Sequence, residues 1–113
     1  MADPRKLLND FQMGLGKLGK DAPEVASAFV NLSNACFVEG EIPGKYKELM
    51  ALSIGVYARC EYCIAYHVFK ALEEGANKDE IMEAATLAVA FGGSPSAAYS
   101  ATLVEECLEA FAK

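Results

Sequence analysis

Two cysteines and the chain's one histidine lie in a short segment that carries the residue types best suited to redox chemistry. Cys60 and Cys63 form a C-x2-C pair, and His67 follows four residues after the second cysteine. On an α-helix, residues three, four and seven apart share one face. The spacing therefore predicts that both thiols and the imidazole lie on one side of a helix.

A helix that begins near Cys60 would favour thiolate chemistry. The first turn of a helix offers unpaired backbone N–H groups and the positive end of the helix dipole, and both stabilise a thiolate. His67 lies one turn after Cys63 and is close enough to accept the proton of its thiol. Cys60 lies closer to the N-terminal end of the helix and is expected to be the more exposed of the two cysteines. Thiols at this spacing can close a disulfide, so attack of one on an oxidised form of the other would complete a reversible cycle. The residues alone leave open which thiol reacts first.

Three other interpretations of the cysteine pair have less support. A thioredoxin-type site would follow a strand of a βαβ unit, and no strand is predicted here. A zinc site usually needs four ligands; the segment supplies three, and Glu48 could be a fourth only under strain. In the purely structural interpretation, both cysteines lie in the hydrophobic core and the histidine beside them only makes hydrogen bonds to its neighbours. We expect no metal and no cofactor.

Helical patterning accounts for the chain around this pair. Apolar residues recur at helical spacing in six segments, several of which have recognisable start and stop signals. The predicted helices begin at Asp3-Pro4, at Asp21-Ala22-Pro23-Glu24, near Lys45, near Cys60, at Asn77 in a capping box with Glu80, and at Ser94-Pro95. No segment alternates apolar and polar residues as a strand does, and no repeat or linker divides the chain. We therefore predict one all-α domain, a helical bundle of about six helices covering residues 1–113.

The sequence also predicts how the helices next to the cysteine pair are buried and where they end. The third helix, which ends near Ala58, is apolar over most of its circumference after Glu48, a pattern typical of a buried helix. The fourth is expected to end at Gly75, in the left-handed position that follows many helices. Cys36 and Cys107 fall within apolar stripes and are expected to be buried small hydrophobes.

Composition excludes several classes of partner. The chain has 113 residues and a net charge of −6, which argues against nucleic acid and against anionic membrane surfaces, since both attract clustered Lys and Arg. No apolar run approaches the roughly 18 residues of a membrane span, and the N-terminal residues lack the pattern of a signal peptide. A cytoplasmic location is expected, where cysteines serve as thiols. Hydrophobic residues make up 53% of the chain, so a homo-oligomer is predicted because one small body cannot bury that much apolar surface alone.

The segment from Glu48 to His67, written E-x11-C-x2-C-x3-H, resembles the alkylhydroperoxidase-D-like branch of the carboxymuconolactone decarboxylase family. The likeness continues through Gly75-Ala76 and the helix start at Asp79-Glu80-Ile81. It implies an all-helical fold and, by similarity to single-domain relatives, a trimer or hexamer. The spacing adds independent support, because the twelve positions from Glu48 to Cys60 allow about three turns of helix and a tight reversal. That path would bring the carboxylate beside the cysteine helix.

The resemblance implies a role for each residue of the pattern. Glu48 would be the base-side end of a proton relay, His67 the intermediary, Cys63 the activated thiol and Cys60 the partner that closes the disulfide. The implied activity is that of a thiol-dependent peroxidase (a peroxiredoxin-like alkylhydroperoxidase) and disulfide reductase in antioxidant defence. Its substrate would be a peroxide or a disulfide, and its thiol electron donor is unknown. Lactone decarboxylation is not expected, because the decarboxylase branch does not work through a C-x2-C pair. The alternative is a non-catalytic module of the same fold that senses redox state or mediates assembly.

Overall fold

The computed structural model describes residues 3–112, and every regular element in that range is a helix. The elements are α1 (Pro4–Asp21), α2 (Pro23–Phe37), α3 (Gly44–Tyr57), α4 (Glu61–Glu73), α5 (Lys78–Leu87), α6 (Val89–Gly92), α7 (Ser94–Tyr99), the π-helical η1 (Ser100–Val104) and α8 (Glu105–Phe111). The predicted all-α fold of about six helices is confirmed. The fifth predicted helix is divided into α5 and α6, and the sixth into α7, η1 and α8.

The helix boundaries follow from local hydrogen bonds that the sequence encodes. Asp3 caps α1, since its Oδ1 accepts the backbone N–H of Arg5 at 3.1 Å. Asn77 and Glu80 form the predicted capping box at the start of α5, with each side chain accepting the other's backbone N–H at 2.8 and 3.0 Å. Gly75 ends α4 with a φ of 94°, a left-handed conformation that glycine adopts without a steric penalty. These predictions are confirmed.

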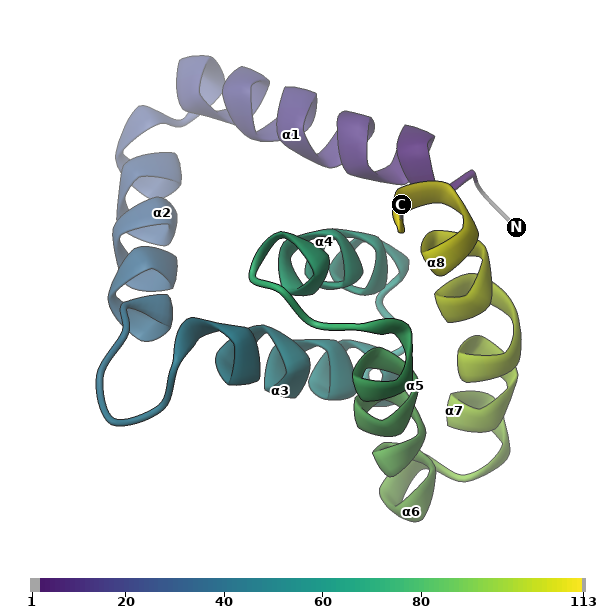
Figure 1. Cartoon of the computed structure of the whole chain (residues 1–113). Coiled ribbons are helices and arrows are strands. Elements are labelled where there is room, and N and C mark those ends of the chain that lie inside the picture. Colours follow the sequence, from purple (N-terminus) through teal and green to yellow (C-terminus); the bar gives the residue numbers. More distant parts are fainter. Residues whose placement is uncertain (1–2, 113) are drawn as a thin grey trace.

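Helix α4 lies at the centre of the fold (Figure 1). It packs against α1, α3, η1 and α8, while α3 also packs against α5. The buried core is formed by aliphatic and small side chains of these helices: Leu7, Leu49, Leu52, Val56, Ile64, Ala65, Val68, Ala71, Ile81, Ala85, Leu103, Val104, Cys107 and Leu108. The helix that begins at the cysteine pair is therefore packed against other helices on several sides, and this packing fixes the position of the pair.

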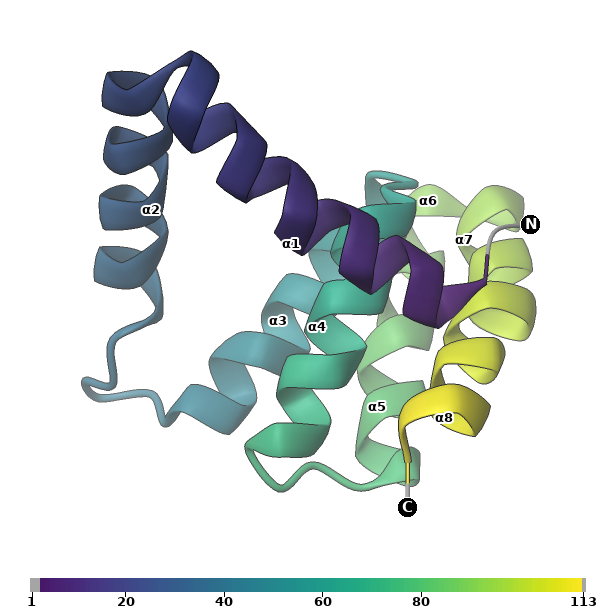
Figure 2. The same cartoon turned by 90° about the horizontal axis from the view of Figure 1, so that it is seen from above.

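Helix α2 stands apart from this core. Figure 2 shows α1 crossing the bundle and then leading to α2, which lies to one side of the other helices. Within α2 only Ala26 is buried, and Val25 and Leu32 are each 65% exposed. An uncovered helix with so few charged residues leaves a broad apolar surface on the isolated chain.

The expectation of a third helix buried around most of its circumference is wrong for the isolated chain. Leu52 and Val56 of α3 are fully buried, but Tyr46, Met50 and Ile54 on other faces of the helix are exposed. Helix α2 packs only sparsely against α3, and Ile54 borders an open pocket between α3, α5 and α6, so these faces of α3 stay uncovered in the isolated chain. In residues 3–112, no helix combines the length and the hydropathy that crossing a membrane requires.

Candidate redox site

The turn between α3 and α4 determines where the first cysteine lies. Arg59 N–H donates to the Val56 carbonyl at 3.1 Å, and Cys60 N–H donates to the Gly55 carbonyl at 3.0 Å. This pair of bonds is a Schellman motif, which closes a helix through one residue in the left-handed conformation. Arg59 occupies that position with a φ of 56°. The reversal leaves only Ala58, Arg59 and Cys60 between the end of α3 and the start of α4.

Cys60 also caps α4. Its Sγ accepts the backbone N–H of Cys63 at 3.2 Å, so the sulfur lies against the unpaired amides of the first turn. A disulfide joins Cys60 to Cys63, whose Cα atoms are 5.2 Å apart. Both residues are partly exposed. When the bond is reduced, the same amides and the helix dipole would stabilise a thiolate at Cys60.

Gly55 lets α4 approach α3 at the cysteine pair. A Cβ added at Gly55 would lie 3.0 Å from the Cβ of Cys63 and 3.6 Å from the backbone N of Ile64. Gly55 is buried in the last turns of α3. The sequence carries a signal for this contact, because a glycine inside a helical pattern often marks close backbone approach, but it does not identify the neighbour.

Replacing Gly55 with alanine is expected to destabilise the fold by up to about 2 kcal/mol. Overpacking costs about 1–3 kcal/mol, which exceeds the gain of about 1 kcal/mol in helix propensity. Gly14→Ala is the matched control, since its added Cβ meets nothing within 4 Å, and it should stabilise α1 by about 0.5–1 kcal/mol. Urea unfolding at one fixed protein concentration measures both. If Gly55→Ala were as stabilising as Gly14→Ala, α4 would not be held against α3 at this point.

Glu48 and His67 meet between α3 and α4. Oε1 of Glu48 lies 2.8 Å from Nδ1 of His67, and their side chains are only 9% and 16% exposed. A carboxylate at Nδ1 favours the imidazole tautomer that carries its proton on that nitrogen, which leaves Nε2 to exchange a proton elsewhere. Water is largely excluded, so the bond is stronger than the same pair would form at the surface.

The structure brings the four predicted site residues together as two bonded pairs, Glu48 with His67 and Cys60 with Cys63. His67 lies one helical turn beyond Cys63 on α4. Among the hydrogen bonds of residues 3–112, none joins the imidazole to either sulfur, and a disulfide has no thiol proton to give. Within the same residues, no three His, Cys, Asp or Glu side chains gather as a metal site would require.

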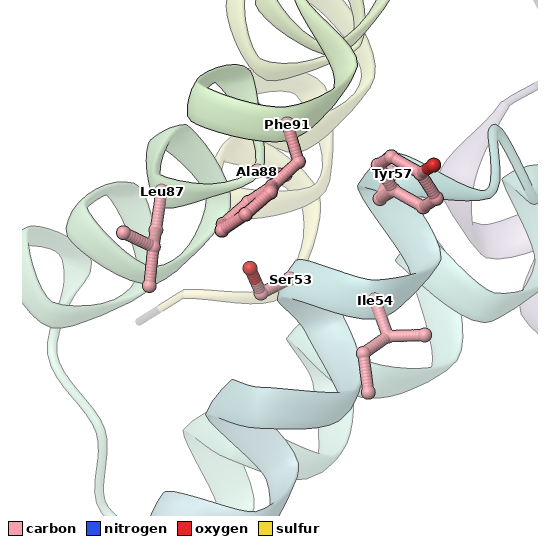
Figure 3. Close-up of a pocket in the computed structure, with 6 residues that line it drawn as sticks. All are labelled: Ser53, Ile54, Tyr57, Leu87, Ala88 and Phe91. Atoms are coloured by element: carbon pink, nitrogen blue, oxygen red, sulfur yellow. The ribbon is translucent and has the colours of Figure 1, made fainter.

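An apolar pocket lies away from these residues. It has a volume of about 390 Å³ and is bounded by α3 on one side and by α5 and α6 on the other. Figure 3 shows Leu87 and Phe91 facing Ile54 and Tyr57 across it. None of the four predicted site residues lines this pocket, so it is a separate surface feature and not the entrance to the cysteine pair.

The two cysteines outside the pair have different environments. Cys107 is buried as predicted, and burial raises the pKa of its thiol to about 12. It therefore stays protonated at neutral pH and takes no part in thiolate chemistry. Cys36 is exposed, so the prediction that it is buried is wrong. Its apolar stripe on α2, which includes Val25, Phe29 and Leu32, is exposed in the structure of residues 3–112.

The fold and the cysteine helix define the class of protein. Residues 23–106 match the family model described as the carboxymuconolactone decarboxylase family, and the chain belongs to that family. The matched range includes all four site residues.

Solved structures of relatives have the same fold. A carboxymuconolactone decarboxylase family protein from Legionella pneumophila, in its apo form, has a TM-score of 0.90 and 32% identity over 97% of each chain. A second family member, from Thermotoga maritima, has a TM-score of 0.75 and 31% identity over 90% of each chain, and its description suggests involvement in an antioxidative response. An uncharacterized protein of Cupriavidus necator is 30% identical over 98 residues, or 87% of each sequence.

Proposed function

We propose that this protein is a thiol-dependent peroxidase or disulfide oxidoreductase, in which Cys60 and Cys63 react and Glu48 and His67 relay protons. One observation carries the proposal: a disulfide-bonded pair opens the same helix on which, a turn later, an imidazole is held by a buried carboxylate. The relative from Thermotoga maritima, with its suggested antioxidative role, supports the same chemistry.

The peroxide reaction would proceed in two steps. A thiolate of the reduced pair attacks one oxygen of the peroxide, the O–O bond breaks, and the sulfur becomes a sulfenic acid while the alkoxide or hydroxide takes up a proton. The second thiol then attacks the sulfenic sulfur, forming the S–S bond and releasing water. The two electrons come from the dithiol, and an external thiol must return them before another cycle.

Protons would move through His67. Its Nε2 can take the thiol proton and return one to the leaving oxygen, while the Glu48 carboxylate at Nδ1 orients the ring and stabilises the imidazolium. The cap at Cys60 and the imidazole after Cys63 act on different sulfurs, so each supports a different first nucleophile. Mass spectrometry of the first sulfenic acid would identify which sulfur reacts.

The same pair could instead reduce a disulfide. A thiolate would attack a substrate disulfide, form a mixed disulfide and release one substrate thiol, and the second cysteine would then displace the other. A cytoplasmic location, as the sequence predicts, would supply reducing thiols for the return step. Both reactions leave the chain in the disulfide form. Consumption of hydrogen peroxide and an alkyl hydroperoxide in the presence of a dithiol reductant, by the wild type and by each Cys→Ser variant, tests the proposal.

The apolar surface of the isolated chain supports assembly into a homo-oligomer, for which the family resemblance implies a trimer or a hexamer. On α2, Val25, Phe29 and Leu32 are exposed, and Ile54 and Phe91 are exposed beside the pocket of Figure 3. Surfaces of this kind are usually covered by another protein surface. Light scattering should give a mass three or six times that of the chain in both redox states, and a monomer would overturn this proposal. A mass that changes on oxidation, together with negligible turnover, would favour the redox-sensing module over the enzyme.

A further inference from the structure

The imidazole of His67 is held by aromatic rings as well as by Glu48. The Phe37 ring stacks on it with centroids 5.5 Å apart and planes 17° apart. The Tyr66 ring meets it edge-on, with centroids 5.1 Å apart and planes 78° apart. Together with the bond from Nδ1 to Glu48, these contacts restrain the ring from three helices, α2, α4 and α3. Phe37 covers one of its flat faces.

Phe37 reaches this position because the end of α2 is attached to α3. Nζ of Lys47 donates to the carbonyl oxygens of Cys36 and Val38, at 3.1 and 2.7 Å. A lysine is well suited to this place, since the last carbonyls of a helix carry the negative end of its dipole. Lys47 directly precedes Glu48. The stretch of α3 that supplies the carboxylate thus also holds the helix end that supplies the stacking ring.

The attachment is specific to the end of α2. Most of that helix is exposed, and apart from the contact of Phe37 with His67 its main contacts are with α1 and, more sparsely, with α3. Phe37, its last residue, is partly buried. Helix α2 contributes little to the core, yet its final side chain lies on the imidazole. Core packing therefore does not explain why the end of α2 is fixed in this place.

We propose that Phe37 is a positioning residue for His67. Its flat face keeps the imidazole in the orientation that directs Nδ1 to Glu48, and its bulk keeps water from that bond. Lys47 acts through Phe37 by holding the end of α2 in place. The catalytic consequence rests on the proposed function, whereas the effect on the imidazole can be measured without it.

The single histidine gives a direct spectroscopic test. The ring nitrogens of the 15N-labelled disulfide form contribute one set of NMR signals, and the wild type should show a protected proton on Nδ1. In Phe37→Ala, exchange of that proton should be about 3- to 10-fold faster, the effect of losing one aromatic contact of ordinary strength, and the 15N shifts should move toward mixed tautomers. Phe37→Tyr keeps a flat ring and should restore the wild-type spectrum.

Two further variants separate positioning from general loss of structure. Lys47→Met keeps most of the side-chain length without the two hydrogen bonds and should move the spectrum in the same direction as Phe37→Ala. Asn34→Ala removes an exposed side chain one turn earlier on α2 and should leave the imidazole signals unchanged. Circular dichroism confirms that each variant is folded.

The outcomes distinguish this inference from the proposed function. An unchanged Nδ1 signal in Phe37→Ala, or a wild type without a protected Nδ1 proton, overturns the positioning role whether or not peroxide is consumed. If the signal changes as expected but the wild type consumes no peroxide, the positioning role stands and the proposed function fails. If both hold, Phe37→Ala should slow turnover and Phe37→Tyr should restore it.

Discussion

Replacing Cys60 or Cys63 with serine should lower sustained peroxide turnover by at least about 100-fold, a conservative figure compared with the effect of removing the nucleophile from characterised enzymes. A serine hydroxyl is not oxidised by peroxide to a sulfenic acid and cannot form a disulfide. Either substitution therefore interrupts the cycle, whichever sulfur reacts first. The variant that keeps the first nucleophile should still consume about one equivalent of peroxide, because that thiol can form a sulfenic acid that has no neighbouring sulfur to displace it.

Peroxide consumption with a dithiol reductant measures sustained turnover. The single-equivalent reaction and the masses of its products are measured on pre-reduced protein from which the reductant has been removed, because a free dithiol would reduce both a sulfenic acid and a disulfide. The variant that gains one oxygen atom identifies the first nucleophile, and the wild type should instead lose two hydrogen atoms as the disulfide closes. Cys36→Ser is the matched control, since Cys36 is exposed and outside the pair, and it should turn over peroxide at the wild-type rate. Full turnover by Cys63→Ser would contradict the proposed chemistry.

Replacing Glu48 with glutamine should lower the rate of peroxide reduction by about 100-fold, the lower end of what a positioned acid–base group contributes. Glutamine keeps the shape of the side chain and a carbonyl oxygen for Nδ1 of His67, but it removes the charge that stabilises an imidazolium. Stability should be unchanged or higher, because a buried carboxylate is costly to desolvate and a neutral isostere is not. A lower rate at equal or greater stability is the signature of a functional charge.

Two comparisons make the Glu48 result decisive. Glu48→Ala leaves Nδ1 of His67 without its partner and should be slower still and also less stable, since a buried polar group is then unpaired. Glu83→Gln is the charge-matched control, because Glu83 is exposed on α5, and its rate should equal that of the wild type. Stopped-flow rates and urea unfolding at a fixed concentration measure both properties. A wild-type rate in Glu48→Gln would remove the carboxylate from the relay.

The cysteine pair and its helix could be predicted because their determinants are local. Asp3, the Asn77–Glu80 box and Gly75 act within a few residues along the chain, and each was confirmed by a hydrogen bond or a backbone angle. The spacing of Cys60 and Cys63 belongs to the same local class, because one helical turn is enough to join them. Such features depend on helix geometry and not on the rest of the fold.

The contacts of the His67 imidazole could be predicted only in part from the sequence. The spacing of Glu48 predicted a carboxylate beside the cysteine helix, and the family pattern connected it with His67. Nothing in the sequence pointed to Phe37 on the ring or to Lys47 at the end of α2. Those contacts join residues on separate helices, and their geometry depends on how α2 returns to α3.

The sequence by itself determined the helices, their caps and the cysteine pair, since these depend on interactions within a few residues along the chain. Only the tertiary structure decided that Glu48 meets Nδ1 of His67, that Gly55 lets α4 approach α3, and that α2 leaves Cys36 exposed. An apolar stripe indicates that a helix face tends to be covered, but it does not specify what covers it or whether the partner lies in the same chain. That choice depends on how the helices pack together, which no single segment encodes.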